Sequence, residues 1–494
     1  MGCREYAVRR TYGVCGDAPL PPNIEKVRVK KLFPLLSGLA LAACAAGPDY
    51  RAPVPTALGV PVAWSDGSAA PEGDAALAEW WRVYNDPVLD GLVARAVESN
   101  LDIAQAASRL RQARESLRQA QADFLPSVSA SGRGGRNFRE GSSDSSSYSL
   151  GADASWEIDL FGGTRRSVEA SRADLQSAGY SLANVRAAIV AETVRNYVTA
   201  RLAQERLRIA RDTLKTVEDN YDIARWRVQA GLVSSLDEEQ ARAQLAQNRA
   251  SIPSIEQSLA GALNRIAVLT GDAPGEATRA LETAAPIPDA PDTITVGIPA
   301  DTLRQRPDVR QAERALAAAT ARIGVAESAL YPSLRISGDV GTSALSLGGL
   351  GDVITGGLFA SIGQLIFDGG ATASRVRAQE AAAEGAFAAY KASVLGALED
   401  VENALVALRA ARERQVQFAD AYDAANNSAI LARSQYQAGL TDFRTLLSAE
   451  QSLLSARQGL ADADADEVFA AAQLYSALGG GWQTMNTIDG WQPE

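Results

Sequence analysis

Two matching stretches of sequence decide the fold: ERLRIARDTLKTVEDNYDIARWRVQAGL (residues 205–232) and ERQVQFADAYDAANNSAILARSQYQAGL (residues 413–440). In both stretches, apolar side chains recur at alternating spacings of three and four residues. The first stripe comprises Leu207, Ala210, Leu214, Val217, Tyr221, Ala224 and Val228, and the second comprises Phe418, Tyr422, Ala425, Ala429, Ala432 and Tyr436. A sustained heptad of this kind is typical of helices in a coiled coil. The sequence therefore predicts coiled-coil packing.

The two stripes lie in long segments without proline, residues 163–230 and 370–438. At a rise of about 1.5 Å per residue, either segment would reach roughly 100 Å as one helix. Both segments run into Ala-Gly-Leu, where Gly231 or Gly439 can adopt the left-handed conformation that ends a helix. We expect each long helix to turn there into a return helix.

The chain is a tandem duplication with a period near 206 residues. The segment DIAQA (102–106) matches DVRQA (308–312), and FLPS (124–127) matches LYPS (330–333). Further along, the Gly-Gly pair at 162–163 matches the pair at 369–370, and QAGL recurs at 229–232 and 437–440. Four matches in one order predict two copies of the same structural unit.

Each repeat is expected to comprise a helix, two strands, a long helix and a return helix. The first helix opens at Asp86-Pro87, an N-cap followed by proline at the first helical position, and continues to about Asp123. The expected boundaries are 86–290 for repeat 1 (strands 125–161, long helix 163–230, return helix 232–270), 291–480 for repeat 2 (helix 302–329, strands 331–368, long helix 370–438, return helix 440–478) and 481–494 for a C-terminal tail.

The predicted strands alternate strictly between apolar and polar side chains. One face carries Leu150, Ala152, Ala154, Trp156, Ile158 and Leu160, and the other carries Ser149, Gly151, Asp153, Ser155, Glu157 and Asp159. The segment 334–340 alternates in the same way. This pattern is typical of a half-buried strand in a soluble sandwich, and equally of a membrane strand with lipid on one side and water on the other.

The N-terminal region contains a secretory signal. Lys30 and Lys31 precede a short apolar run that ends in Leu41-Ala42-Ala43-Cys44. This order resembles the bacterial lipoprotein signal, in which the cysteine is acylated and becomes the new N-terminus. We therefore expect a signal peptide over 1–43, lipidation of Cys44 and a lipid-anchored segment over 44–85. Residues 1–26 do not fit a signal peptide, and we interpret them as a misassigned start.

Composition excludes several classes of function. The chain has 494 residues and no histidine, which excludes Ser-His-Asp and Cys-His catalytic sites and removes the commonest transition-metal ligand. The net charge of −11 argues against a nucleic-acid partner. We expect neither an enzyme nor a cofactor or metal site.

Several motifs together resemble the outer membrane factor family of TolC-like efflux channels, and its NodT-like lipoprotein branch in particular. They are the lipoprotein cysteine, WWRVYNDPVL (80–89), Arg306-Pro307-Asp308-Val309 and LYPS (330–333). The resemblance implies an all-α protein with membrane β-structure. It implies a homotrimer in which four strands per chain form a twelve-stranded β-barrel in the outer membrane. Long helices continue this barrel as a coiled-coil tunnel through the periplasm.

The same resemblance implies passive conduction of substrate from an inner-membrane pump and a periplasmic adaptor, with a proton-driven pump favoured over an ATP-driven one. It places a gate at the helical tips, where Asp237 matches an acidic position of the family and Asp442 is a substitute in the second repeat. Gly231, Leu232, Gly439 and Leu440 would meet the adaptor. The structural alternatives are helix N-terminal acids stabilised by the helix dipole and ordinary turn glycines.

Two other functions fit the sequence. The channel could be the exit duct of a type I protein secretion system, which these motifs do not distinguish from an efflux duct. The chain could instead be a periplasmic coiled-coil scaffold held at the membrane by its lipid alone. A scaffold needs no membrane-embedded strands, so the strands decide between these two classes.

Overall fold

The computed structural model describes residues 45–64, 75–138, 140–141, 145–275, 279, 281–294, 296–297 and 299–483. The expected signal peptide (1–43), Cys44 and most of the expected tail (484–494) lie outside the described residues. The helices are α2 (Ala75–Ala78), α3 (Pro87–Ser99), α4 (Leu101–Ala122), α5 (Gly163–Gln229), α6 (Ser235–Leu269), α8 (Pro299–Gln305), α9 (Pro307–Ser328), α10 (Ala371–Gln437) and α11 (Phe443–Ala477), with short 3-10 turns η1 (Pro55–Leu58), η2 (Trp80–Tyr84) and η3 (Leu347–Gly349). The strands are β1 (Ser127–Asn137), β2 (Ser145–Ile158), β3 (Ser333–Ala344) and β4 (Ile354–Gly363).

The two long helices are α5 and α10, each of 67 residues, which corresponds to a length of about 100 Å. Their heptad stripes are the buried stripes, since Leu207, Val217, Ala432 and Tyr436 are all less than a tenth exposed. Among the described helices, none combines the length and the apolar character needed to cross a membrane.

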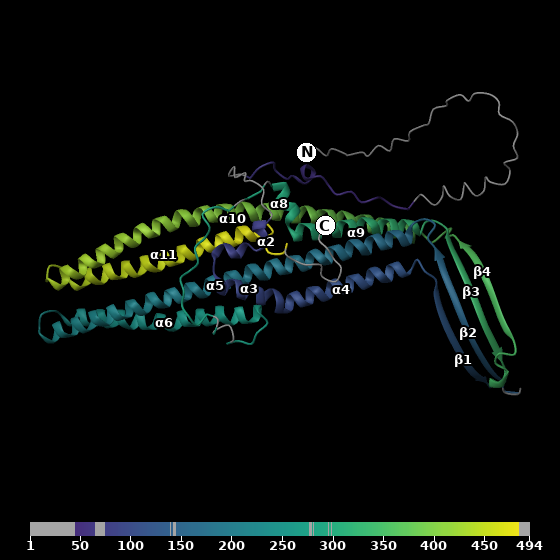
Figure 1. Cartoon of the computed structure of the whole chain (residues 1–494), viewed down its shortest axis with the longest axis horizontal. Coiled ribbons are helices and arrows are strands. Elements are labelled where there is room, and N and C mark those ends of the chain that lie inside the picture. The colour runs from purple at the N-terminus through teal and green to yellow at the C-terminus, as the bar shows by residue number, and fades with distance from the viewer. Residues whose placement is uncertain are drawn as a thin grey trace, which may run out of the picture. The chain divides into compact units, whose positions relative to one another are not determined.

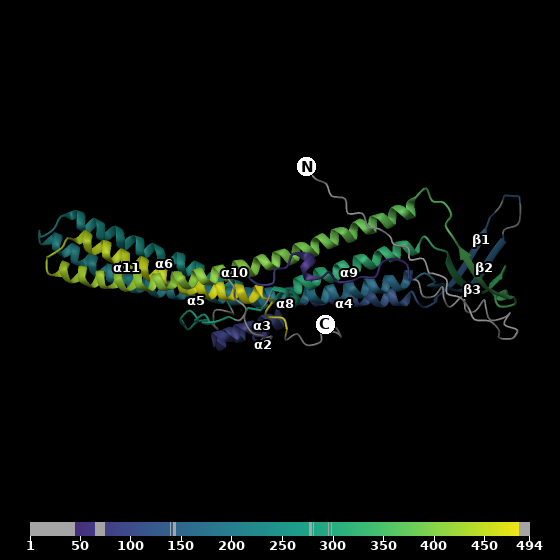
Figure 2. The ribbon, with the colours of Figure 1, turned by 90° about the horizontal axis from the view of Figure 1, so that it is seen from above.

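The helices form one layer in which α5 lies inside and α10 lies at an edge. Helix α5 packs against α4 and α9 in the half near the sheet, and against α6 and α11 in the other half. Helix α10 packs mainly against α9 and α11. The sheet lies at one end of these helices, and the turns of the α5–α6 and α10–α11 hairpins lie together at the other end (Figures 1 and 2). The two repeats are therefore alike in elements but unlike in surroundings.

The first helix of repeat 1 is broken, which corrects the prediction of one continuous helix from Asp86 to about Asp123. As predicted, the Asp86 carboxylate caps α3 by accepting from the amides of Val88 and Leu89. The helix then ends at Asn100, whose extended backbone starts α4. The Asn100 side-chain oxygen accepts from the amides of Asp102 (2.8 Å) and Ile103 (3.2 Å), and its amide group donates to the Leu269 carbonyl (2.9 Å). One buried side chain thus satisfies the backbone at this break.

Replacing Asn100 with alanine is expected to destabilise the helical layer by about 2 kcal/mol. The substitution removes an N-cap and leaves the Leu269 carbonyl without this donor. The midpoint of thermal loss of the helical circular-dichroism signal measures the effect. Asn100→Ser keeps a capping oxygen but cannot replace the amide donor, so it should recover about half of the loss. Equal midpoints for wild type and Asn100→Ala would contradict this account.

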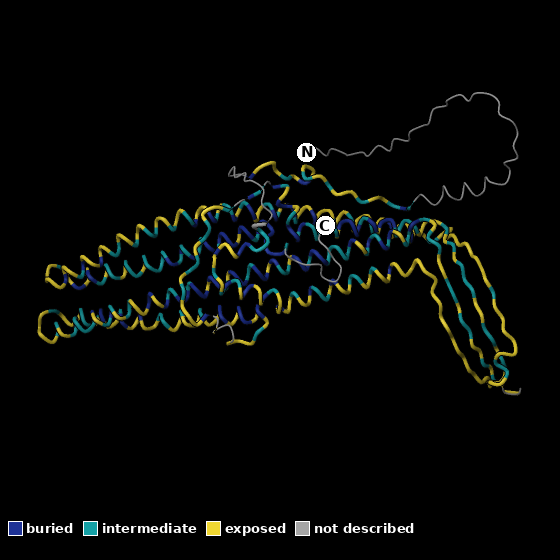
Figure 3. Tube along the Cα trace, in the orientation of Figure 1, coloured by how far each residue is buried: buried dark blue, intermediate teal, exposed yellow. Residues whose placement is uncertain are grey.

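The sheet is antiparallel throughout, in the order β1-β2-β3-β4. Its register places Ala152 opposite both Ala130 and Val340, and places Asp153 opposite both Ser129 and Asp339. One face therefore carries the apolar set and the other carries the polar set, as the alternation predicted. The apolar side chains are largely exposed in the single chain: Val128 is 73%, Val340 51%, Leu358 80% and Ile362 72% exposed. Figure 3 shows the outer strands β1 and β4 exposed along their length, whereas β2 and β3 vary between exposed and half-buried.

The Arg306-Pro307-Asp308 motif joins three helices. Arg306 is 8% exposed, and its guanidinium donates to both carboxylate oxygens of Asp308 (3.0 and 2.7 Å), to Asp400 on α10 (2.9 Å) and to the Ala477 carbonyl at the end of α11 (3.0 Å). Burial lowers the pKa of Arg306, but hydrogen bonds and charges from Asp308 and Asp400 outweigh burial and raise it. The motif is thus a structural joint.

Residues 45–64, here called the N-terminal strap, are held by the helices. Leu58 lies in an apolar cluster with Leu303, Val309, Tyr390 and Val394, from α8, α9 and α10. Further along the strap, Trp64 is buried and its indole nitrogen donates to the Gly297 carbonyl at 2.6 Å. The strap is therefore part of the folded body.

Candidate functional site

The turns of the two helical hairpins are built alike. Gly231 and Gly439 have φ of +72° and +74°, and the amides of Leu232 and Leu440 donate to the carbonyls of Arg227 (2.9 Å) and Gln435 (2.8 Å). This is the glycine-terminated helix end that the sequence predicted. Leu232 is 72% and Leu440 78% exposed. Each turn therefore presents one uncovered leucine.

The two predicted gate acids have different surroundings. Asp237 lies half-buried in the first turn of α6. Asp442 is exposed and caps α11, since its carboxylate accepts from the Thr445 amide (2.8 Å) and hydroxyl (2.6 Å). These bonds, that of the hydroxyl first, lower the pKa of Asp442. Both acids thus lie at helix N-termini, as the structural alternative describes, and Asp442 in addition caps its helix.

Both hairpins share one small core just behind their turns. It comprises Ala224 of α5, Ala241 of α6, Ala432 and Tyr436 of α10, and Phe443 and Leu446 of α11. The Arg227 guanidinium lies 4.2 Å from the centre of the Tyr436 ring, which is a favourable cation–π geometry. Burial raises the pKa of Tyr436, Arg227 opposes this, and the charge of Asp237 adds to it. Arg227 and Tyr436 therefore meet between the hairpins.

A buried carboxylate joins the hairpins further from the turns, and the sequence analysis missed it. Glu450 of α11 accepts from Asn220 of α5 and from Arg433 of α10, the latter at 2.9 Å. Burial raises the pKa of Glu450, and the bonds from Arg433 and Asn220 lower it in part. Asn220 lies next to Tyr221 of the heptad stripe, so a polar residue at the border of the apolar stripe was the available signal. Glu450 carries no such signal. The repeat does not mark it either, because the matching position in repeat 1 is Arg242.

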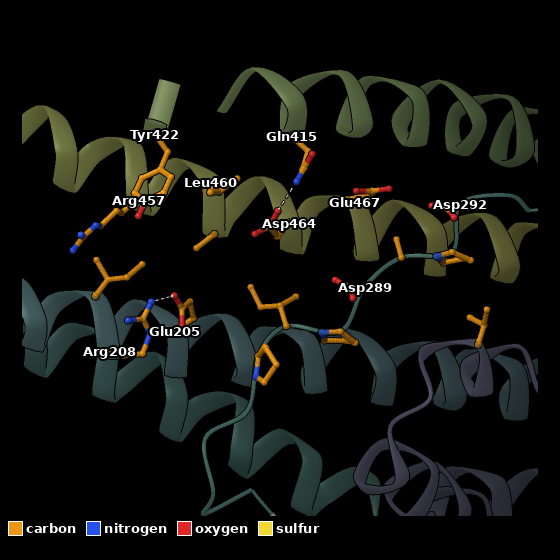
Figure 4. Close-up of a pocket in the computed structure, with 18 of the residues that line it drawn as sticks. Glu205, Arg208, Asp289, Asp292, Gln415, Tyr422, Arg457, Leu460, Asp464 and Glu467 are labelled. Carbon is orange, nitrogen blue, oxygen red and sulfur yellow. Dashed lines mark hydrogen bonds and ion pairs between the residues drawn. The ribbon is translucent and has the colours of Figure 1, made fainter. Parts of the chain in front are cut away.

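An acidic cleft of about 1040 Å³ lies between the hairpins near the linker that joins the repeats (Figure 4). Its walls are α5, α10 and α11, and the linker segment 286–292 crosses it. Its charged lining comprises Glu205, Arg208, Asp212, Asp289, Asp292, Arg457, Asp464 and Glu467. Burial raises the pKa of Asp464. The hydrogen bond that Gln415 donates at 3.2 Å lowers it in part, and the charges of Glu467, Asp289 and Glu205 raise it further. The cleft therefore has a negative field.

Within the described ranges, no group of three or more acidic, cysteine or histidine side chains is arranged to hold a metal ion. The candidate site is consequently a set of surfaces: two exposed turns, the contacts that tie them together, and a polar cleft behind them. Such surfaces can bind a partner or steer ions by charge.

Comparison with known proteins identifies the family. The sequence matches the family described as outer membrane efflux protein over residues 92–272 and 298–480. It is 31% identical over 451 residues to nodulation protein T of Rhizobium leguminosarum bv. trifolii, which covers 90% of this chain and 96% of that protein. It is 30% identical over 463 residues to the cation efflux system protein CusC of Escherichia coli O6:H1, with 92% and 99% covered.

Among solved structures, the outer-membrane channel OprN superimposes with a TM-score of 0.78 at 34% identity, covering 89% of this chain and 100% of that one. This likeness confirms the TolC-like fold class that the motifs predicted. The sequence matches and the shared fold agree on a location in the bacterial outer membrane. The chain therefore belongs to the outer membrane efflux protein family and is the outer-membrane channel component of a tripartite efflux system.

Proposed function

We propose that three copies of this chain assemble into one closed channel that conducts substrate passively. The observation that carries this proposal is the open sheet. Strands β1 and β4 each pair on one side only within the described residues. Unpaired edges can pair with another chain, and a rotational assembly satisfies all of them at once. Pairing β1 of one copy with β4 of the next would give twelve strands from three copies.

The outer side of α10 supports the same assembly. Several of its large apolar side chains are at least two-fifths exposed in the single chain: Phe387, Leu395, Val406, Val416, Ile430 and Leu431. Exposed apolar surface of this extent along one helix marks an interaction site. A neighbouring copy in a closed ring would cover it.

The proposal includes a lipid anchor on Cys44. The signal pattern ahead of it supports acylation, and Ala45, the next residue, already belongs to the strap. One acyl chain binds a membrane only marginally. We therefore propose a multiply acylated cysteine that acts together with the embedded strands.

Docking of the adaptor is assigned to the hairpin turns, at Gly231, Leu232, Gly439 and Leu440. The exposed side chains of Leu232 and Leu440 support this assignment, because an exposed leucine can pack into a groove between helices of a partner. The gate is assigned to Asp237, with Asp442 as a second acid in the turn of the other hairpin. Contacts between Arg227 and Tyr436 would hold the two turns together while the channel rests.

Replacing Asp237 with asparagine is expected to reduce the preference of single channels for cations several-fold. A carboxylate a few ångströms from a passing ion contributes on the order of 1 kcal/mol even in water, and three copies would form a ring. Current reversal potentials in planar bilayers under a salt gradient measure the preference. Asp442→Asn, in which asparagine keeps the helix cap, removes the second proposed gate acid and should reduce the preference by a smaller factor, because Asp442 is the more exposed of the two. Unchanged selectivity in Asp237→Asn would remove Asp237 from the gate.

The pump is proposed to be proton-driven, and the substrate remains to be assigned by experiment. A gene deletion should raise susceptibility to part of a panel of antibiotics, dyes and metal salts, and a plasmid copy should restore resistance. Unchanged susceptibility together with loss of a secreted protein from the medium would favour the secretion duct instead.

A further inference from the structure

Phe359 of β4 is an aromatic residue on the polar face of the sheet. The register places it opposite Ser337 of β3, which lies opposite Ser155 of β2, and residues directly opposite each other share a face. Every other residue that the described strands place on this face is serine, threonine, asparagine, glycine or a charged residue. The side chain of Phe359 is 58% exposed. It therefore adds little to the packing of the single chain.

The ring of Phe359 lies over a glycine and beside a carboxylate. A Cβ added to Gly357 would lie 2.6 Å from Cζ of Phe359 and 3.5 Å from Oδ1 of Asp339. The ring edge and the carboxylate oxygen thus both lie within 3.5 Å of one point above Gly357. A carboxylate at this place is favourable, because the edge of an aromatic ring is its positive part. Gly357 therefore leaves room for the ring to lie next to Asp339.

Two carboxylates on this face have no basic partner. Asp339 lies directly opposite Asp153 of β2, and both residues are exposed, although like charges in this arrangement repel each other. Further along the face, Glu157 is paired with Arg335, which donates to it at 3.3 Å. Within the described ranges, neither Asp153 nor Asp339 forms such an ion pair. Two uncompensated negative charges therefore lie beside an exposed ring.

A neighbouring copy would not cover the ring with an apolar side chain. In the proposed channel, β4 pairs with β1 of the next copy, and the polar faces of the two strands lie on the same side. On this face β1 carries Ser127, Ser129, Ser131, Arg133, Gly135 and Asn137. No apolar side chain is among them, whatever the register of the pairing. Phe359 should therefore stay open to the lumen, because the apolar face takes the lipid side of a membrane strand.

We propose that Phe359, Asp339 and Asp153 form a luminal site for organic cations that carry an aromatic or other apolar body. The charged group lies at the two carboxylates, and the body lies on the ring, where the cation also gains from the aromatic face. A hydrated metal ion would gain from the carboxylates alone, and an uncharged aromatic compound from the ring alone. The substrate class that this site favours is thus the lipophilic organic cations. This inference rests on the proposed closed channel, which places the polar face inward.

Blockade of single-channel currents in planar bilayers tests the ring. Benzyltrimethylammonium should block wild-type channels at a concentration about fivefold lower than tetramethylammonium, which has the same charge but no ring. Phe359→Ser should abolish this difference, whereas Phe359→Tyr retains the ring and should keep it. Benzenesulfonate, an anion with the same ring, should not block at these concentrations. A half-blocking concentration of benzyltrimethylammonium that is equal in wild type and Phe359→Ser would overturn the proposal.

The carboxylates are tested by a matched pair of variants. Asp339→Asn removes one charge beside the ring and should raise the half-blocking concentration of both cations about fivefold. Asp352→Asn removes the same charge from an exposed position in the loop between β3 and β4, and it should leave both concentrations close to wild type. Equal effects of the two variants would assign the block to the overall field of the channel and refute the site.

A second pair of variants applies if Phe359→Ser fails to assemble. Gly357→Ala retains the ring and both acids, but its methyl group would displace the ring from Asp339, whereas Gly363→Ala adds a methyl on the same face whose nearest neighbour is 3.8 Å away. Only Gly357→Ala should weaken the block, and equal blocks would refute the site.

The failure of the site and the failure of the proposed channel give different results. Wild-type protein that forms neither a heat-stable trimer nor conducting channels would refute the closed channel, and the site with it. Trimers that conduct but show no ring-dependent block would refute the site alone.

Discussion

Replacing Arg306 with alanine is expected to lower the free energy of unfolding by about 3 kcal/mol, in the range found when one member of a buried ion pair is removed. Within the part of the chain that the structure describes, the guanidinium alone joins Asp308, Asp400 and the end of α11. Without it, two carboxylates lie close together and the Ala477 carbonyl loses its donor. Both carboxylates are partly exposed, at 31% and 58%, so water limits the loss to the lower part of that range.

Arg304→Ala is the matched control for this prediction. Arg304 lies two residues earlier, is 68% exposed and pairs with Asp301 at the surface, so its loss should cost less than about 1 kcal/mol. Thermal midpoints of the helical circular-dichroism signal in detergent should separate the two variants clearly. Similar midpoints for Arg304→Ala and Arg306→Ala would mean that Arg306 does not stabilise the packing of α9, α10 and α11.

Replacing Val340 with arginine is expected to prevent most of the protein molecules from assembling in the outer membrane. Val340 lies on the apolar face of β3, opposite Ala152 and Gly356. A charged side chain on the lipid face of a membrane strand costs about 2–4 kcal/mol near the bilayer centre. The amount of heat-stable oligomer extracted from outer membranes measures the outcome. A periplasmic scaffold held by its lipid alone would tolerate the substitution, so this variant also separates the two classes of function.

Ser343→Arg is the control on the same strand. Ser343 lies three residues from Val340 but on the polar face, opposite Ser149, where a charged side chain would meet water. It should assemble at close to the wild-type level. If both variants assemble equally well, the apolar face does not contact lipid.

The sequence predicted the elements whose signals are local. Heptad spacing and the Ala-Gly-Leu ends were sufficient for α5 and α10, because a helix of this length needs a long regular stripe. Strict alternation was sufficient for the faces of the sheet. The break at Asn100 was missed although asparagine is a preferred N-cap residue, because no glycine or proline stands beside it; its bond to the Leu269 carbonyl, 169 residues away, has no local signal at all.

The candidate site was predicted in part for the same reason. Turn residues such as Gly231 and Leu440 follow from local chemistry. The contacts between hairpins do not follow from local chemistry, because Arg227 meets Tyr436 and Asn220 meets Glu450 only after the α5–α6 hairpin has packed against the α10–α11 hairpin. Arg166 of α5 is 5% exposed and donates to the Ala46 and Gly47 carbonyls of the strap. It was also missed, since an arginine early in a helix carries no local signal that a distant segment will bury it.

The unequal places of α5 and α10 have a consequence for biogenesis. A newly folded chain already covers α5 with five neighbouring helices (α3, α4, α6, α9 and α11), while the outer side of α10 stays in water. In a monomeric chain, α10 should therefore show the fastest hydrogen exchange and the earliest proteolytic cleavage. Protection of α10 should appear only as the protein concentration rises and copies associate. In a cell that overproduces this protein, periplasmic proteases would therefore cleave unassembled chains at α10.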